Sequence, residues 1–136
     1  MDFSVKTTHP EKHRCDCLIV AVSEPRRLSA AGERINQASK GYLSQLLKRG
    51  DIEGKFGQFL MLQNIPGISA ERVLLVGQGN STISDFNFRD LMSRTAVYMN
   101  NTAIKEAVSY LNVIEVTEKD LSWKLQQTLF LFQASH

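Results

Sequence analysis

The chain has 136 residues, of which 43% are hydrophobic and 22% are charged, and its formal net charge at pH 7 is +2. These values fit one domain with a buried core, exclude a disordered chain and require no nucleic-acid partner. No apolar run approaches the roughly 20 residues needed to cross a bilayer, and the polar residues 1–16 do not form a signal peptide. We therefore expect a cytoplasmic protein with no membrane partner.

Strands are predicted in five places, where the chain carries short apolar runs or alternating apolar residues. They are Asp2–Lys6, Cys17–Val22, Phe59–Leu62, Val73–Val76 and Ala107–Leu111, the last continued or bulged at Ile114 and Val116. The first is expected at an edge of the sheet. The unbroken run CLIVAV at 17–22 is typical of a strand covered on both faces. Pro25 ends that strand, and Asn64–Gly67 predicts a turn between the third and fourth strands.

Helices are predicted where apolar residues recur every three or four positions. The four apolar stripes are Leu28–Ala38, Leu43–Leu47, Phe88–Met99 and a last one with Leu121, Leu125, Leu129 and Phe132 on one face. Helix starts are expected at Ser29, within Ser81–Asp85 and at Asp120 or Ser122, and helix ends at Gly50 and Asn100–Asn101. Strands that alternate with amphipathic helices predict an α/β fold with helices on both faces of the sheet.

Residues 42–80 are the most distinctive part of the chain and contain its highest density of glycine residues. The characteristic groups are Leu46-Leu47-Lys48-Arg49-Gly50, Gly54-Lys55, Gly57-Gln58, Pro66-Gly67, Ala70-Glu71-Arg72-Val73-Leu74-Leu75-Val76-Gly77 and Gly79. In these groups the chain resembles the N-terminal domain of the leucyl aminopeptidases, also called cytosol aminopeptidases. FSVK at 3–6 and EPRRL at 24–28 are similar to its bacterial branch. The resemblance implies a macro-domain-like fold for residues 1–136, a three-layer α/β/α sandwich with a mixed sheet of five or six strands.

The resemblance also implies a function for a complete enzyme. Members of the family release N-terminal amino acids from peptides with two divalent metal ions, Zn or Mn, in a separate C-terminal domain that carries an Asn-Thr-Asp-Ala-Glu-Gly-Arg motif. That motif is absent here. We therefore predict no catalytic, cofactor-binding or metal-binding residue in this chain, His136 included, and no peptidase activity for it alone. Its implied partners are its own catalytic domain, the other subunits of a homo-hexamer and, in some bacteria, duplex DNA.

The residues Gly77-Gln78-Gly79-Asn80 follow a predicted strand and precede a predicted helix. Such loops in α/β folds bind phosphate through backbone N–H groups and a helix N-terminus. An alternative function is therefore a macro-type module that binds ADP-ribose or a related nucleotide at this loop. The third glycine of a dinucleotide fingerprint is missing, so a sharp turn without a ligand is the simpler interpretation.

Four possible metal ligands lie close together in the sequence: His9, His13, Cys15 and Cys17. Their spacing matches no standard zinc site, and Pro10 interrupts the helix that would bring the two histidines together. In an extended strand the two cysteines point to opposite faces. The sequence therefore predicts reduced thiols and a solvated loop in place of a metal site.

Basic side chains are concentrated in the first half of the chain. Residues 1–68 hold ten Lys and Arg against seven Asp and Glu, whereas residues 69–136 hold six against seven. The candidates for a phosphate-facing surface are Lys12, Arg14, Arg26, Arg27, Arg34, Lys48, Arg49 and Lys55. Residues of this kind more often form an ordinary solvated face, so the DNA interpretation depends on the resemblance.

Six aromatic residues recur at helical spacings in two segments. They are Phe86, Phe88, Tyr98, Trp123, Phe130 and Phe132, and we interpret them as core and interface residues and not as a platform for stacking bases. Nucleophilic catalysis has no support, because the sequence contains no G-x-S-x-G elbow.

Overall fold

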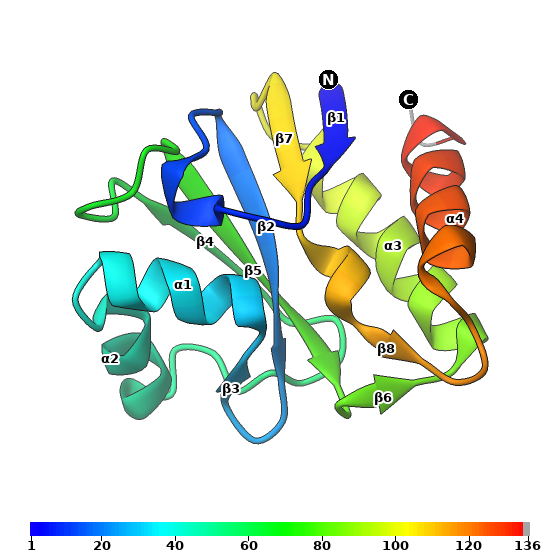
Figure 1. The fold of residues 1–136 in the computed structure, drawn as a ribbon, viewed down its shortest axis with the longest axis horizontal. Helices are drawn as coiled ribbons and strands as arrows, with labels where there is room; N and C mark the ends of the chain where they lie inside the picture. The colour runs from blue at the N-terminus through cyan, green and yellow to red at the C-terminus, as the bar shows by residue number, and fades with distance from the viewer. Residues whose placement is uncertain (135–136) are drawn as a thin grey trace.

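The computed structural model describes residues 1–134 and contains a mixed sheet between two layers of helices (Figure 1). The six-stranded sheet has the order β1-β7-β2-β5-β4, with the short β3 paired to β2. Its strands are β1 (Asp2–Val5), β2 (Cys17–Ser23), β3 (Arg27–Leu28), β4 (Phe59–Gln63), β5 (Arg72–Gly79) and β7 (Glu106–Ser109). Two further strands, β6 (Thr82–Ile83) and β8 (Glu115–Val116), pair in parallel as a separate ladder. The predicted macro-domain-like sandwich is confirmed.

Within residues 1–134, four α-helices and two short 3₁₀ helices complete the fold. They are η1 (Pro10–Lys12), α1 (Ala30–Ala38), α2 (Tyr42–Arg49), α3 (Asp85–Asn100), η2 (Leu111–Val113) and α4 (Leu121–Ala134). Helices α1 and α2 cover one face of the sheet, and α3 and α4 cover the other (Figure 1). No helix within residues 1–134 is both long and apolar enough to cross a membrane.

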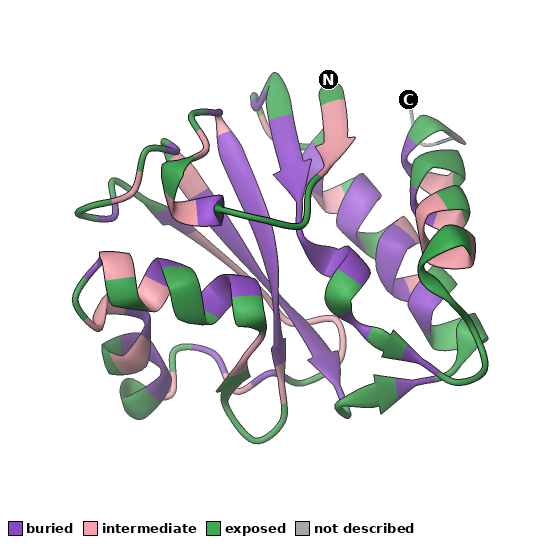
Figure 2. Cartoon of the chain, in the orientation of Figure 1, coloured by how far each residue is buried: buried purple, intermediate pink, exposed green. Residues whose placement is uncertain are grey.

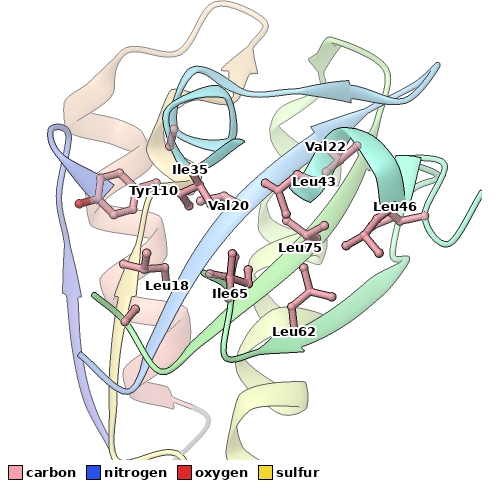
Figure 3. Close-up of a cluster of buried hydrophobic side chains, with 14 of the residues drawn as sticks. Leu18, Val20, Val22, Ile35, Leu43, Leu46, Leu62, Ile65, Leu75 and Tyr110 are labelled. Atoms are coloured by element: carbon pink, nitrogen blue, oxygen red, sulfur yellow. The ribbon is translucent and has the colours of Figure 1, made fainter. Parts of the chain in front are cut away.

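Strand β2 shows why the sheet needs a helical layer on each side. It pairs in parallel with β5, and β5 pairs in antiparallel fashion with β4. Because side chains alternate along a strand, Leu18 and Val20 enter the core under α1 and α2, whereas Ile19 and Ala21 enter the core under α3. Figure 3 shows the first of these cores, and Figure 2 shows that the central strands are buried along most of their length.

The helix caps follow the predicted chemistry. The hydroxyl of Ser29 accepts a hydrogen bond from the Gly32 amide at the start of α1, and that of Ser84 does the same for the Asn87 amide at the start of α3. Asp120 accepts a bond from the Trp123 amide at the start of α4. Gly50 ends α2 in the left-handed conformation that favours glycine.

The structure differs from the sequence interpretation in two places near the C-terminus. The strand predicted to reach Leu111 ends at Ser109, and Leu111 begins η2 because its amide bonds to the Ser109 hydroxyl at 3.1 Å. Helix α4 also buries only part of its apolar stripe: Leu121 and Leu129 are exposed, whereas Phe132 is buried together with Thr128. The Phe132 ring stacks on Phe3 of β1, with ring centroids 3.8 Å apart, and belongs to the core under α3. His136 lies outside the described residues.

Candidate functional surfaces and related proteins

The predicted glycine loop at 77–80 is in fact mostly strand. Gly77, Gln78 and Gly79 are the buried last residues of β5. The Gly77 amide donates to the Gln58 carbonyl at 2.7 Å, and the Gly79 amide donates to the Gly54 carbonyl at 2.8 Å. These two amides are therefore not available to a phosphate, and residues 77–79 belong to a strand and not to the predicted loop.

The loop at residues 53–58, which packs against the end of β5, contains three converging backbone amides that the sequence interpretation missed. The amides of Glu53, Gly54 and Lys55 all donate to the Oε1 atom of Gln58, at 3.0, 3.0 and 3.2 Å. Converging amides of this kind can bind anions, and here a side-chain amide oxygen takes the place of the anion. In the sequence, the pairs Gly54-Lys55 and Gly57-Gln58 marked this loop as unusual. They did not show that the amides would bind the Gln58 side chain.

Close packing explains two of the glycines in this region. A Cβ on Gly54 would lie 2.6 Å from the Ser23 carbonyl oxygen, and a Cβ on Gly77 would collide with the Lys55 carbonyl. The loop therefore packs backbone against backbone on β2 and β5, which only glycine permits. We conclude that the glycine pattern serves packing at this edge of the sheet.

The four possible metal ligands are not brought together. Cys15 belongs to the core under α1 and α2 and Cys17 to the core under α3, which confirms that they point to opposite faces. Both thiols are free, and burial raises their pKa to about 11 and about 12. His9 instead lies 3.3 Å from the guanidinium of Arg34. Within residues 1–134 no group of three His, Cys, Asp or Glu residues is placed to hold a metal ion.

An ion pair joins η1 to α1 on the same side of the molecule. Arg34 donates to both carboxylate oxygens of Glu11, at 3.2 and 2.8 Å. The hydrogen bond from Arg34 lowers the pKa of Glu11 from 4.5 to about 2. This two-point contact fixes the loop that precedes β2 against the outer face of α1.

The eight basic candidates fall into two groups. Arg34, Arg49 and Lys55 face the carboxylates of Glu11, Asp51 and Glu53, at 2.8, 2.8 and 3.8 Å. Within the part of the chain that the structure describes, no carboxylate lies within ion-pair distance of the other five: Lys12, Arg14, Arg26, Arg27 and Lys48.

Three of these five unpaired residues line one open cavity of about 520 Å³ between the β2–β3 turn and helices α1 and α2. The cations are Arg26, Arg27 and Lys48, and Glu33 is the acidic group of the lining. The Arg26 guanidinium lies beside Gly50, where α2 ends and its partial negative charge concentrates. The cavity therefore has a local excess of positive charge, in a chain whose net charge is small.

The aromatic residues divide between core and surface. Phe88 and Phe132 are buried, and Trp123 packs against Phe88 with ring centroids 5.7 Å apart. Phe86 and Phe130 are 74% and 64% exposed. The core part of the prediction is confirmed for the first three residues, whereas Phe86 and Phe130 have no core role in this structure.

Sequence comparison matches nearly the whole chain to cytosol aminopeptidases. A model of the cytosol aminopeptidase family, N-terminal domain, matches residues 19–135. Probable cytosol aminopeptidases of Psychromonas ingrahamii and Idiomarina loihiensis are 45% and 47% identical over 128 and 130 residues. One from Tolumonas auensis is 45% identical over 136 residues. These alignments cover 93–99% of this chain and 25–27% of the relatives, so the chain spans about a quarter of their length.

Solved structures agree with the fold. A mutant tomato leucine aminopeptidase superposes with a TM-score of 0.62 and 19% identity, over 97% of this chain and 28% of that one. The macrodomain of Mycobacterium tuberculosis DarG superposes with a TM-score of 0.70 and 9% identity, over 97% of this chain and 90% of that one. At such identities the likeness concerns the fold alone.

Proposed function

This chain belongs to the cytosol aminopeptidase family, as its N-terminal domain, and from that premise we propose that it is the non-catalytic domain of a cytoplasmic, metal-dependent aminopeptidase. The observation that carries the proposal is the unequal coverage of the alignments. Nearly all of this chain matches the relatives, yet it accounts for 25–27% of their length. Residues 1–136 would form one domain, and the catalytic residues would lie in the remaining three-quarters.

In this proposal the catalytic domain binds two divalent metal ions, Zn or Mn. They would activate water and stabilise the charge that develops during hydrolysis. Within residues 1–134 the side-chain donors do not fit such a centre, because the Cys15 and Cys17 thiols enter cores on opposite faces of the sheet and no three His, Cys, Asp or Glu residues are grouped to hold a metal ion. The domain would instead pack on the catalytic domain and contribute to assembly of a homo-hexamer.

A domain exchange tests this proposal. The purified 136-residue chain should not hydrolyse a leucyl amide substrate in the presence of manganese. A chimera, in which this chain replaces the matching residues of the Psychromonas ingrahamii relative, should hydrolyse the substrate and assemble like that relative. Hydrolysis by the chain alone, or an inactive and unassembled chimera, would contradict the proposal.

DNA binding is a second candidate function, and the basic cavity favours it. Arg26, Arg27 and Lys48 surround one open depression and are free of ion pairs with other described residues. Phosphate contacts by Lys and Arg release counterions, so the affinity for DNA should fall steeply with salt. This interpretation predicts that the chain retards duplex DNA in a gel at low salt.

The matched variants for that test differ only in where the charge is lost. Arg27→Ala combined with Lys48→Ala should weaken retardation and reduce the slope of log affinity against log salt by about 2. Lys6→Ala combined with Lys105→Ala, which removes two exposed charges outside the cavity lining, should change neither. Equal effects of the two changes would show that binding, if present, does not use the cavity.

A further inference from the structure

The outer face of α4 lacks the charge expected of a solvated helix. Its 14 residues include one charged side chain, Lys124. The Nζ atom of Lys124 turns inward and donates to the Ile114 carbonyl at 3.0 Å, and burial lowers its pKa. The exposed residues are Leu121, Ser122, Gln126, Leu129, Phe130 and Gln133. A helix that is uncharged on its outside is typical of one that is covered on both sides.

An apolar groove extends this face towards the edge of the sheet. It has a volume of about 410 Å³ and is lined by Met1, Phe3, Leu129, Phe132 and Gln133, none of which is charged in its side chain. Leu129 is 50% exposed and its neighbour Phe130 is 64% exposed. Among the described residues β1 pairs with β7 alone, so its other side is an open sheet edge. Large apolar side chains and an open edge therefore occur together where β1 and α4 meet. Figure 1 shows these two elements beside each other.

We propose that this surface, the α4 face formed by Met1, Phe3, Leu129, Phe130 and Gln133, is where the catalytic domain of the same polypeptide docks. The inference rests on the proposed function, because it needs a longer chain. Three relatives are matched over only 25–27% of their length, from their N-terminal domain. The remaining chain of such an enzyme would leave this domain from its last described element, α4.

The chemistry of the surface favours this occupant over a transient partner. A covalently attached domain has a high effective concentration next to α4, whereas a free second copy does not. Permanent interfaces are also more hydrophobic than transient ones and carry little charge at their centre. The groove and the helix face have that composition, whereas the basic cavity beside α1 and α2 does not.

Thiol accessibility tests the proposal without relying on activity. Cys15 and Cys17 are buried and their thiol pKa values are raised, so a cysteine placed on the surface reacts selectively with a maleimide. Leu129→Cys is the test variant, and Val97→Cys on α3, where Val97 is 56% exposed, is the matched control. In the Psychromonas ingrahamii chimera we expect position 129 to react at least about tenfold more slowly than in the isolated chain, and position 97 to react equally in both.

The possible outcomes separate the occupants. Equal reactivity of position 129 in the two proteins would overturn the proposal. Protection that appears in the isolated chain at high concentration and disappears on dilution would assign the surface to a second copy, and would also overturn it. Circular dichroism on each variant confirms that both proteins are folded before labelling.

A charge substitution provides an independent check. Leu129→Glu should lower the thermal stability of the chimera, whereas Val97→Glu, the same change at another exposed apolar position, should not. If the chimera with the natural residues is itself inactive and unassembled, the proposed function fails. If that chimera is active and Leu129→Glu changes nothing, the function stands and the docking surface is wrong.

Discussion

Both helical layers bury apolar side chains against the sheet, but their outer surfaces differ. On one side of the sheet, α1 and α2 bury Ile35 and Leu43, and on the other side α3 buries Phe88 and Leu91. The outer faces differ, because α1 and α2 expose Glu33, Arg34, Lys48 and Arg49, whereas α4 exposes leucine, phenylalanine, serine and glutamine.

This difference shows that the composition of the core indicates the fold, whereas the composition of the surface indicates whether that surface is exposed to water or covered by a partner. The buried residues of both layers specify a sheet covered on both faces, and any member of the fold class needs them. The charge of α1 and α2 indicates a face exposed to water, whereas the neutrality of α4 indicates a face that needs a partner. A substitution should therefore have a similar effect in either core but a different effect on each outer face.

The largest effect is expected for a core truncation on the α3 side. Phe88 is fully buried and its ring packs on Trp123. Phe88→Ala should lower the free energy of unfolding by about 3–5 kcal/mol, because it removes apolar contacts and leaves a cavity. Leu43→Ala in the opposite core should cost about 2–5 kcal/mol for the same reason. Urea denaturation measures both, and a loss below about 1 kcal/mol for either variant would show that one layer is not a packed core.

A smaller loss of stability is expected at Gly54, where the loop after α2 packs its backbone against the backbone of β2. An added Cβ at Gly54 would lie 2.6 Å from the Ser23 carbonyl, at a φ of +96°. Gly54→Ala should therefore cost about 3 kcal/mol, from the sum of strain and collision. Gly41 has a φ of +85° and no atom near its missing Cβ, so Gly41→Ala is the matched control and should cost about 1 kcal/mol. If the two variants unfold at the same denaturant concentration, the collision is relieved by movement of the loop.

Much of the fold could be predicted from local pattern. The unbroken run at 17–22 and the caps at Ser29, Ser84 and Asp120 each depend on neighbours in sequence, and the structure agrees with them. The buried residues of α4 could not be predicted in this way. Its sequence is apolar on several sides, and Phe132 packs on Phe3, a residue more than a hundred positions away, and in the core under α3.

The functional surfaces show the same limit. The list of eight basic residues contained the three cations of the cavity, but spacing could not show that Arg34, Arg49 and Lys55 would face carboxylates. The glycines at 77 and 79 were visible as special positions. Their role as packing sites depends on the loop at 54–58, whose residues lie directly against both glycines.

The charged layer should respond to acid through one specific pair. The pKa of Glu11 is lowered from 4.5 to about 2 by its hydrogen bonds with Arg34. A carboxyl with a depressed pKa contributes stability that is fully present above its ordinary value and is lost as the pH falls through the lowered one. The melting temperature of the native chain should thus exceed that of Glu11→Gln at pH 6, and the gap should close between pH 4.5 and 2. An NMR titration of Glu11 with a midpoint near 4.5 would contradict this.

The smallest effect, and the one that most sharpens the contrast, is expected at Leu129. In the isolated chain this side chain is half exposed, so Leu129→Gln should change the free energy of unfolding by no more than about 0.5 kcal/mol. Leu43→Gln, the same change at a buried position, should cost several times more, because it places an amide in the core without a partner. Denaturation of the two variants measures the difference. A large loss at Leu129 would mean that the α4 face already stabilises this domain by itself, and its apolar residues would then need no partner to explain them.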